Sequence, residues 1–174
     1  MRETLSGVLE KNVCIIEEEA VSVGNINICA FPISHDAVNP VGYTMVSEGE
    51  KVSVATDTGI INESMLSALC GSDKVMIEAN HDLNLLAMGN YPDMLKRRIR
   101  SDKGHLCNEK AGELAVSLFK EGTKKFLLGH LSQENNHPDL AYVTVREKLL
   151  SCGAKEEIDF ILKMTHPSKT GEIL

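Results

Sequence analysis

The stretch KVSVATDTGIINESMLSAL, residues 51–69, decides the class of the fold because the spacing of its apolar residues changes part-way along. Residues 51–56 have the composition of a β-strand, and Asp57-Thr58-Gly59 then supplies turn-forming residues. Asn62 is a good helix N-cap, and the apolar residues near it recur at helical spacing, namely Ile61, Met65, Leu66 and Leu69. The stretch therefore predicts a strand, a loop and a helix in succession, as in an α/β protein.

The segments on either side continue this alternation. Towards the N-terminus, short apolar runs predict strands at 13–16, 25–33 and 43–46, the last joined to the strand at 51–56 by a hairpin turn over 47–50. Towards the C-terminus, the sequence predicts strands at 74–79, 125–128 and 157–164, and helices from Asp82 to Gly89, from Pro92 through Ile99, from Asn108 as the cap to Lys120, and over 138–151. We expect one α/β domain over residues 1–174, with a loose tail at 165–174.

The charge of the chain is uneven. Overall, 18 Lys and Arg residues stand against 25 Asp and Glu residues, for a formal net charge of -7. The run KRRIRSDK at 96–103 nevertheless holds five basic residues and one acidic residue. Because a local basic run can bind an anionic polymer despite a negative total, net charge alone does not exclude nucleic acid as a partner.

Composition also bears on the compartment. No apolar stretch approaches the roughly 18 to 20 residues that a membrane-spanning helix needs, and acidic residues interrupt the first twenty positions, so we expect no membrane span and no signal peptide. The five cysteines are widely spaced and form no C-x-x-C pair. We therefore expect a reducing, cytoplasmic location.

Polar residues follow several of the predicted strands. His35, Asp57, His81 and His130 each come shortly after an apolar run, and loops that leave one edge of an α/β sheet converge in space. Imidazole and carboxylate are ligands of zinc and manganese, so these residues indicate a metal site. Taken singly, a histidine after a strand is more often an ordinary hydrogen-bonded residue than a ligand, and Asp57 is also compatible with the capping of a turn.

Four segments carry a resemblance to a known family: FPISHDAVNPVGYTM, KVSVATDTG, EANHDLNLLAMGNYPDMLKRRIRSDKGHLCN and FLLGHLSQENNHPDLA. Together they resemble the metallo-β-lactamase-fold hydrolases, and most closely the bacterial DNA exonucleases found beside a cell-wall two-component regulator. The resemblance implies that His35 binds one metal, that Asp57 bridges two metals and that His130 binds the second. It also implies two divalent ions, zinc or manganese, whose activated water attacks a phosphodiester, with DNA as the substrate, single-stranded or at its ends.

One departure from the family is large. The H-x-H-x-D-H cluster that supplies most other ligands in the family is absent, and His35 is the first histidine of the chain. The sequence therefore resembles only the later part of the αββα sandwich, its C-terminal repeat and part of the first. We expect such a chain to be a poor hydrolase alone and to expose a face that binds a second copy or the missing N-terminal half. Hydrolysis of another ester or a lactam, or partner binding without catalysis, are alternatives.

Further residues are candidates for contact with substrate. Within the resembling segments, His81 and His105 are expected at the rim of the metal site, and Asn135 and Asn136 at the mouth of its pocket. The alternative for each is local: His81, Asp82, His105 and Asn108 would cap helices, and the asparagines would form a plain loop. The basic residues expected to follow a phosphate backbone are Lys96, Arg97, Arg98 and Arg100, the alternative being a solvated helix face.

Overall fold

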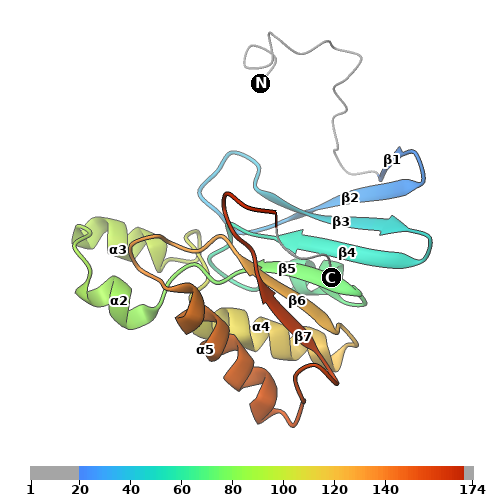
Figure 1. Cartoon of the computed structure of the whole chain (residues 1–174). Coiled ribbons are helices and arrows are strands. Elements are labelled where there is room, and N and C mark those ends of the chain that lie inside the picture. The colour runs from blue at the N-terminus through green and yellow to red at the C-terminus, as the bar shows by residue number, and fades with distance from the viewer. Residues whose placement is uncertain (1–19, 171–174) are drawn as a thin grey trace.

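The computed structural model describes residues 20–170, which form one seven-stranded sheet with helices packed against it (Figure 1). The strands occur in the sheet in the order of the chain. They are β1 (Val21–Val23), β2 (Ile26–Pro32), β3 (Val41–Ser47), β4 (Glu50–Ala55), β5 (Lys74–Glu78), β6 (Lys125–Gly129) and β7 (Ile161–Met164). The strand expected at 13–16 lies outside the described residues, and the strands expected at 25–33, 43–46, 51–56, 74–79 and 125–128 are confirmed in position.

Two strands differ from expectation. β1 was not predicted, because Ser22, Gly24 and Asn25 together look like a turn. Of these three residues, only Gly24 is in the left-handed region, with φ of 63°. The residues before it, Val21–Val23, pair with β2. β7 begins at Ile161 rather than at Glu157. Glu157 has φ of 62° and its amide donates to the carbonyl of Phe160, so a tight turn occupies the start of the expected strand.

The direction of the strands brings their carboxyl ends together. β1 to β4 pair antiparallel, and β4 to β7 pair parallel. β2 therefore runs in the same direction as β4, β5 and β6. The loops after these four strands leave the sheet at one edge, where α/β proteins place their sites.

The helices begin largely where the sequence predicts. They are α1 (Glu63–Leu69), α2 (Leu83–Met88), α3 (Asp93–Ile99), α4 (Asn108–Lys120) and α5 (Pro138–Ser151). Asn62 caps α1 through the Met65 amide, and Asp82 caps α2. The expected cap at Asn108 was wrong, because Cys107 is the N-cap and the Asn108 side chain instead exchanges hydrogen bonds with Asn136 inside the protein.

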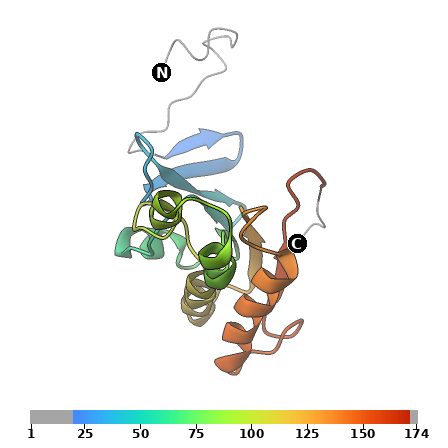
Figure 2. The ribbon, with the colours of Figure 1, turned by 90° about the vertical axis from the view of Figure 1, so that its left-hand side faces the viewer.

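The core lies between one face of the sheet and helices α1, α4 and α5. Val75, Ile77, Phe126 and Leu128 are wholly buried, and their alternation along β5 and β6 places them on the same face. Helices α4 and α5 pack side by side below the sheet, whereas α2 and α3 lie beyond its edge (Figures 1 and 2). Among residues 20–170, no helix is long and apolar enough to cross a membrane.

Within residues 20–170, no helix covers the opposite face of β1 to β4. Strand register places nine apolar residues on it, none of them buried: Val21, Val23, Ile26, Ile28, Ala30, Tyr43, Met45, Val52 and Val54. We call this set the open face. Val23 is 57% exposed, so the sheet is sealed by helices on one side only within the described residues.

Candidate metal centre

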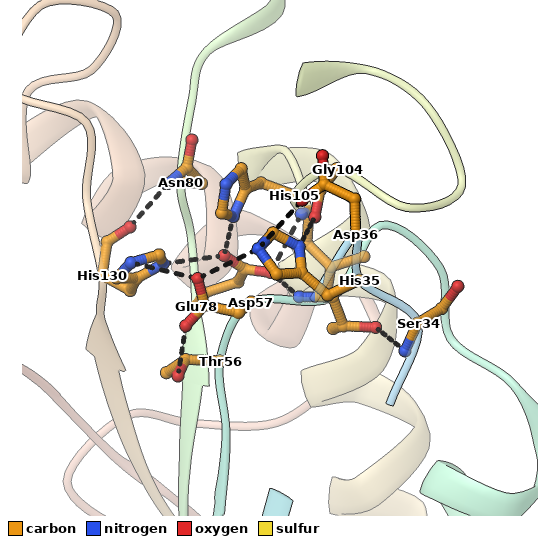
Figure 3. Close-up of polar contacts among 12 residues, drawn as sticks. Ser34, His35, Asp36, Thr56, Asp57, Glu78, Asn80, Gly104, His105 and His130 are labelled. Atoms are coloured by element: carbon orange, nitrogen blue, oxygen red, sulfur yellow. Dashed lines mark hydrogen bonds and ion pairs between the residues drawn. The ribbon is translucent and has the colours of Figure 1, made fainter. Parts of the chain in front are cut away.

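The three residues expected to bind metal meet at the edge of the sheet (Figure 3). His35, Asp57 and His130 lie in the loops after β2, β4 and β6. Asp57 Oδ1 stands 3.7 Å from His35 Nε2 and 3.5 Å from His130 Nε2, so the carboxylate lies between the two imidazoles. Residues 95 positions apart in the sequence thus point at one another because parallel strands end together.

The backbone at this site is in an uncommon conformation. Asp57 has φ of 60° and His130 has φ of 54°, both in the left-handed region that residues other than glycine rarely adopt. For His130, a hydrogen bond from Asn80 Nδ2 to its carbonyl oxygen, 2.9 Å long, holds the turn. A strained backbone persists only where the surrounding structure maintains it, and such positions are concentrated at functional sites.

Glu78, at the end of β5, organises the centre from beneath and was not singled out by the sequence. Its side chain is fully buried. Oε1 accepts hydrogen bonds from the amides of Thr58 (2.6 Å) and Leu106 (3.2 Å), and Oε2 lies 3.0 Å from His105 Nδ1 and 3.1 Å from His130 Nδ1. Burial by itself would raise the pKa of Glu78, but the hydrogen bonds from His105, His130 and Thr58 outweigh it and lower the pKa. A lone acidic residue closing the apolar run of β5 was the available signal.

His105 stands between the other two histidines. Its ring centroid is 5.0 Å from that of His35 and 5.2 Å from that of His130. One of its nitrogens lies within 4.8 Å of ligand atoms of His35 and Asp57. The sequence predicts His105 at the rim of the metal site, and in the structure its ring lies between those of His35 and His130.

These residues fit a divalent metal by their geometry. His35 Nδ1 is 3.1 Å from the carbonyl oxygen of Gly104, and His130 Nδ1 faces Glu78, so the proton of each neutral ring belongs on Nδ1 and Nε2 carries the lone pair. Two ligand atoms on one tetrahedral zinc lie roughly 3.3 Å apart, given bonds of about 2.0 to 2.1 Å. The observed separations of 3.5 and 3.7 Å are close to that value and too long for good hydrogen bonds.

Glu78 also affects the charge of the centre. Its hydrogen bond raises the pKa of His130, and the negative charge of Asp57 raises it further. Together these effects outweigh the burial of the ring, which by itself would lower the pKa. All the acceptor positions of Glu78 that face the interior are already engaged by Thr58, Leu106 and the two imidazoles. Glu78 is therefore better suited to orienting ligands than to binding the ion itself.

Known proteins resemble this chain in sequence and in fold. No family model matches the chain. Over 144 residues it is 40% identical to the exodeoxyribonuclease WalJ of Streptococcus pneumoniae, covering 83% of this chain and 54% of that protein. It is 39% identical over 126 residues to the exodeoxyribonuclease YycJ of Bacillus anthracis, covering 72% of this chain and 48% of that protein.

Solved structures agree with these relatives. The metallo-β-lactamase fold protein YhfI of Bacillus subtilis matches with a TM-score of 0.62 at 16% identity, over 94% of this chain and 58% of that one. The chain has the metallo-β-lactamase fold. The Zn²⁺-bound PqqB of Methylobacterium extorquens matches with a TM-score of 0.55 at 15% identity, over 91% of this chain and 51% of that one. The resemblance seen in the sequence is confirmed.

The match is partial in length. The chain spans about half of each of the two exodeoxyribonucleases, 54% and 48%. The given sequence also contains no H-x-H-x-D-H cluster, so the ligands predicted from it are His35, Asp57 and His130 alone.

Three of the residues expected to contact substrate lie inside this metallo-β-lactamase fold. His81 is 1% exposed, Asn135 is 1% exposed and Asn136 is 9% exposed. Asn136 Nδ2 donates to the carbonyl of Ala79 and to Asn108 Oδ1, which ties the loop after β6 to the loop after β5. None of the three lines the cleft, and the side chains of Asn135 and Asn136 hold the loop after β6 in place.

The basic residues of α3 divide into two groups. Arg98 forms a bidentate ion pair with Asp36, Nε to Oδ2 at 2.5 Å and a second contact at 2.9 Å, which lowers the pKa of Asp36. Lys96 Nζ donates to the carbonyl of Ala87. Arg97 and Arg100 are exposed and pair with no carboxylate among residues 20–170, so they remain accessible to an anion.

A cleft of about 490 Å³ opens beside the metal centre. It is lined by Asp57, His105 and His130 together with residues of α3 and of the loop after β6. The centre is therefore reachable by a ligand. The α3 residues that line the cleft are Leu95 and Ile99, and none of the basic residues of α3 is among them.

Proposed function

We propose that this chain supplies part of a two-metal site to a phosphodiesterase that digests DNA as an exonuclease. The observation that carries the proposal is the convergence of His35 Nε2, Asp57 Oδ1 and His130 Nε2 at 3.5 and 3.7 Å beside an open cleft. The relatives named exodeoxyribonucleases support DNA as the substrate. The Zn²⁺ in PqqB, a protein with the same fold, supports a divalent metal.

A bound divalent metal would supply an activated water and would polarise the scissile phosphate. His35, Asp57 and His130 would hold it. His105 has its Nδ1 on Glu78, so its other nitrogen is directed away from Glu78 and, when protonated, can donate to the oxygen that leaves phosphorus. The imidazole-rich set favours zinc, and the carboxylate also suits manganese.

Arg97 and Arg100, with Lys103, would contact the phosphate backbone of a single strand or a strand end leading to the cleft. Each phosphate neutralised on single-stranded nucleic acid lowers the slope of log affinity against log salt by about 0.7. Binding of single-stranded DNA that stays constant as salt rises would contradict this part of the proposal.

The metal site is tested with the isolated chain, without relying on activity. Isothermal titration with Zn²⁺ and with Mn²⁺ should show binding by the wild type, and Asp57→Asn and His130→Ala should each weaken it at least roughly tenfold, since each removes a ligand or its charge. His137→Ala is the matched control, because the His137 side chain is 67% exposed and caps α5 away from the centre. Equal metal binding by Asp57→Asn and the wild type would overturn the proposal.

We further propose that ligands from outside this sequence complete the two-metal site, supplied by a polypeptide with the H-x-H-x-D-H cluster or by a second copy. Three ligands do not fill two sites of four or more ligands each.

We also propose a reducing, cytoplasmic location. It is in keeping with a DNA substrate and with the free thiols of Cys29, Cys70, Cys107 and Cys152.

A second candidate is a binding subunit without catalysis. The observation in its favour is the length of the match, about half of each exodeoxyribonuclease, together with the missing cluster. Mixing the chain with a polypeptide that carries the cluster distinguishes the two candidates. Metal-dependent digestion of DNA by the mixture supports the enzyme, and faster cleavage of a thioester or lactam would indicate another hydrolase class.

A further inference from the structure

The lining of the cleft is of two chemical kinds. The candidate metal ligands Asp57 and His130, together with His105, contribute polar groups. Tyr91, Leu95, Ile99 and Leu131 contribute apolar groups. A polar ligand alone, such as inorganic phosphate, would use only the first kind. The second kind matches a ligand that also has a flat apolar part.

Tyr91 is held in place by its neighbours and has no role in the core. It lies in the turn between α2 and α3, directly before Pro92, which restricts its backbone to an extended conformation. Its ring is partly buried but does not belong to the cluster of core residues. Its hydroxyl makes no hydrogen bond with any of residues 20–170. The structure thus holds an aromatic ring at the cleft that the fold itself does not use.

The turn that carries Tyr91 is packed against the loop after β6. Gly89 lies so close to that loop that a Cβ atom on it would stand 2.6 Å from Asn135 Oδ1. The same loop places Ser132, Gln133 and Glu134 along the cleft. Hydroxyl, amide and carboxylate groups of this kind hydrogen-bond the edges of bases, whereas the Glu134 carboxylate repels a phosphate. A nucleotide would therefore place its base here and its phosphate at the metal centre.

We propose that the cleft binds the terminal nucleotide of a DNA strand, with its base stacked on Tyr91 and hydrogen-bonded by the Ser132–Glu134 loop. This inference rests on the proposed function and names the part of the substrate that the centre receives. The volume of about 490 Å³ lies within the range of roughly 300 to 1,000 Å³ usual for ligand pockets. Stacking is tolerant of base identity, as a nuclease without sequence preference requires.

The experiment titrates the full chain against the deoxynucleoside monophosphate of a fluorescent adenine analogue, whose emission falls when its base stacks. Titrations are run with and without Mn²⁺, and deoxyribose phosphate competes in a second series. The wild type should quench the emission and prefer the nucleotide over the sugar phosphate. Tyr91→Ala should bind the nucleotide roughly five- to one hundred-fold more weakly, the usual loss for one stacked base, while Tyr91→Phe stays close to the wild type.

Tyr43→Ala is the control, because Tyr43 is a tyrosine that also reaches the surface, 39% exposed, but lies on β3, away from the cleft. Nucleotide binding by Tyr91→Ala equal to that of the wild type would overturn the inference, as would equal affinity of the wild type for deoxyribose phosphate. If the chain binds no metal but its quenching of the nucleotide still depends on Tyr91, the proposed function fails and the inference is supported. Metal binding without such quenching would overturn the inference alone.

Discussion

Glu78 controls the orientation of two imidazoles from a single buried carboxylate. Its Oε2 faces Nδ1 of both His105 and His130. In Glu78→Gln, the amide group has one acceptor oxygen for four donors and adds two donors of its own, so at least one ring loses its fixed orientation. We expect Zn²⁺ affinity to fall about 10- to 100-fold in isothermal titration, the usual effect of losing an outer partner of a ligand.

The control for that substitution is Glu113→Gln, since Glu113 is an exposed residue of α4 that pairs with Lys110. It should leave Zn²⁺ affinity unchanged. Glu78→Gln binding Zn²⁺ as tightly as the wild type would mean that the rings are held by something other than this carboxylate.

His81 makes stability depend on pH. Burial, with smaller effects from nearby His105 and Arg100, lowers its pKa from 6.5 to about 4. The unfolded chain therefore binds a proton that the folded chain does not between pH 6.5 and about 4, so the free energy of unfolding falls as pH falls through this window. His81→Gln should remove roughly 2 to 3 kcal/mol of that dependence. Urea unfolding of both proteins at several pH values measures it, and parallel curves would contradict it.

At the residue scale, the sequence pointed to the candidate ligands but not to the residues that support them. His35, Asp57 and His130 follow apolar runs, and strand ends predict convergence without knowledge of distance. Glu78 is the last residue of the largely apolar strand β5, and its role becomes clear only from the positions of His105 and His130 in the folded protein. The burial of His81 could not be predicted either, because a histidine that follows a strand can point to either side of the sheet.

At the scale of elements, the loop after α3 positions the loop of His35. Ser34 Oγ donates to the carbonyl of Asp102, and His35 Nδ1 faces the carbonyl of Gly104. Gly104 is essential to this contact, because a Cβ atom there would stand 2.1 Å from the carbonyl oxygen of Ile99. In Gly104→Ala the loop must shift, at a cost of about 1 to 3 kcal/mol, and we expect Zn²⁺ affinity to fall as well.

Gly71→Ala separates loss of stability from loss of position. Gly71 has φ of 71° and open space around it, so alanine adds about 1 to 2 kcal/mol of backbone strain far from the centre. Thermal unfolding should show both variants destabilised, and isothermal titration should show weaker Zn²⁺ binding only in Gly104→Ala. Loss of Zn²⁺ affinity in both would mean that stability alone explains the effect.

Helix starts were predictable where a side chain caps the helix by itself, as Asn62 and Asp82 do. Asn108 is the same type of residue as Asn62, but its side chain hydrogen-bonds to Asn136, 28 residues away, instead of capping α4. The local sequence does not show that this distant partner competes with the cap. β1 escaped prediction for a similar reason. Three residues become a strand only because β2 provides the pairing edge.

For the whole molecule, the open face is the feature that most demands a partner. Its apolar side chains on β1 to β4 are partly or fully exposed, whereas helices α1, α4 and α5 pack against the other face of the sheet and bury residues such as Phe31 and Ala55. A contiguous apolar surface of this kind favours association. We therefore expect the isolated chain to self-associate as its concentration rises, with a sedimentation coefficient that increases accordingly.

Two residues of β3 offer a matched test of that expectation. Tyr43 is 39% exposed and lies on the open face, while Val46 is 37% exposed and, three positions along the strand, points to the opposite face. Tyr43→Lys should shift sedimentation towards the monomer, because a charge in an apolar contact must be desolvated. Val46→Lys adds the same charge at similar exposure and should leave association unchanged. An equal shift in both variants would show that net charge, rather than the open face, governs assembly, and a wild type that stays monomeric at high concentration would remove the basis for a partner at this face.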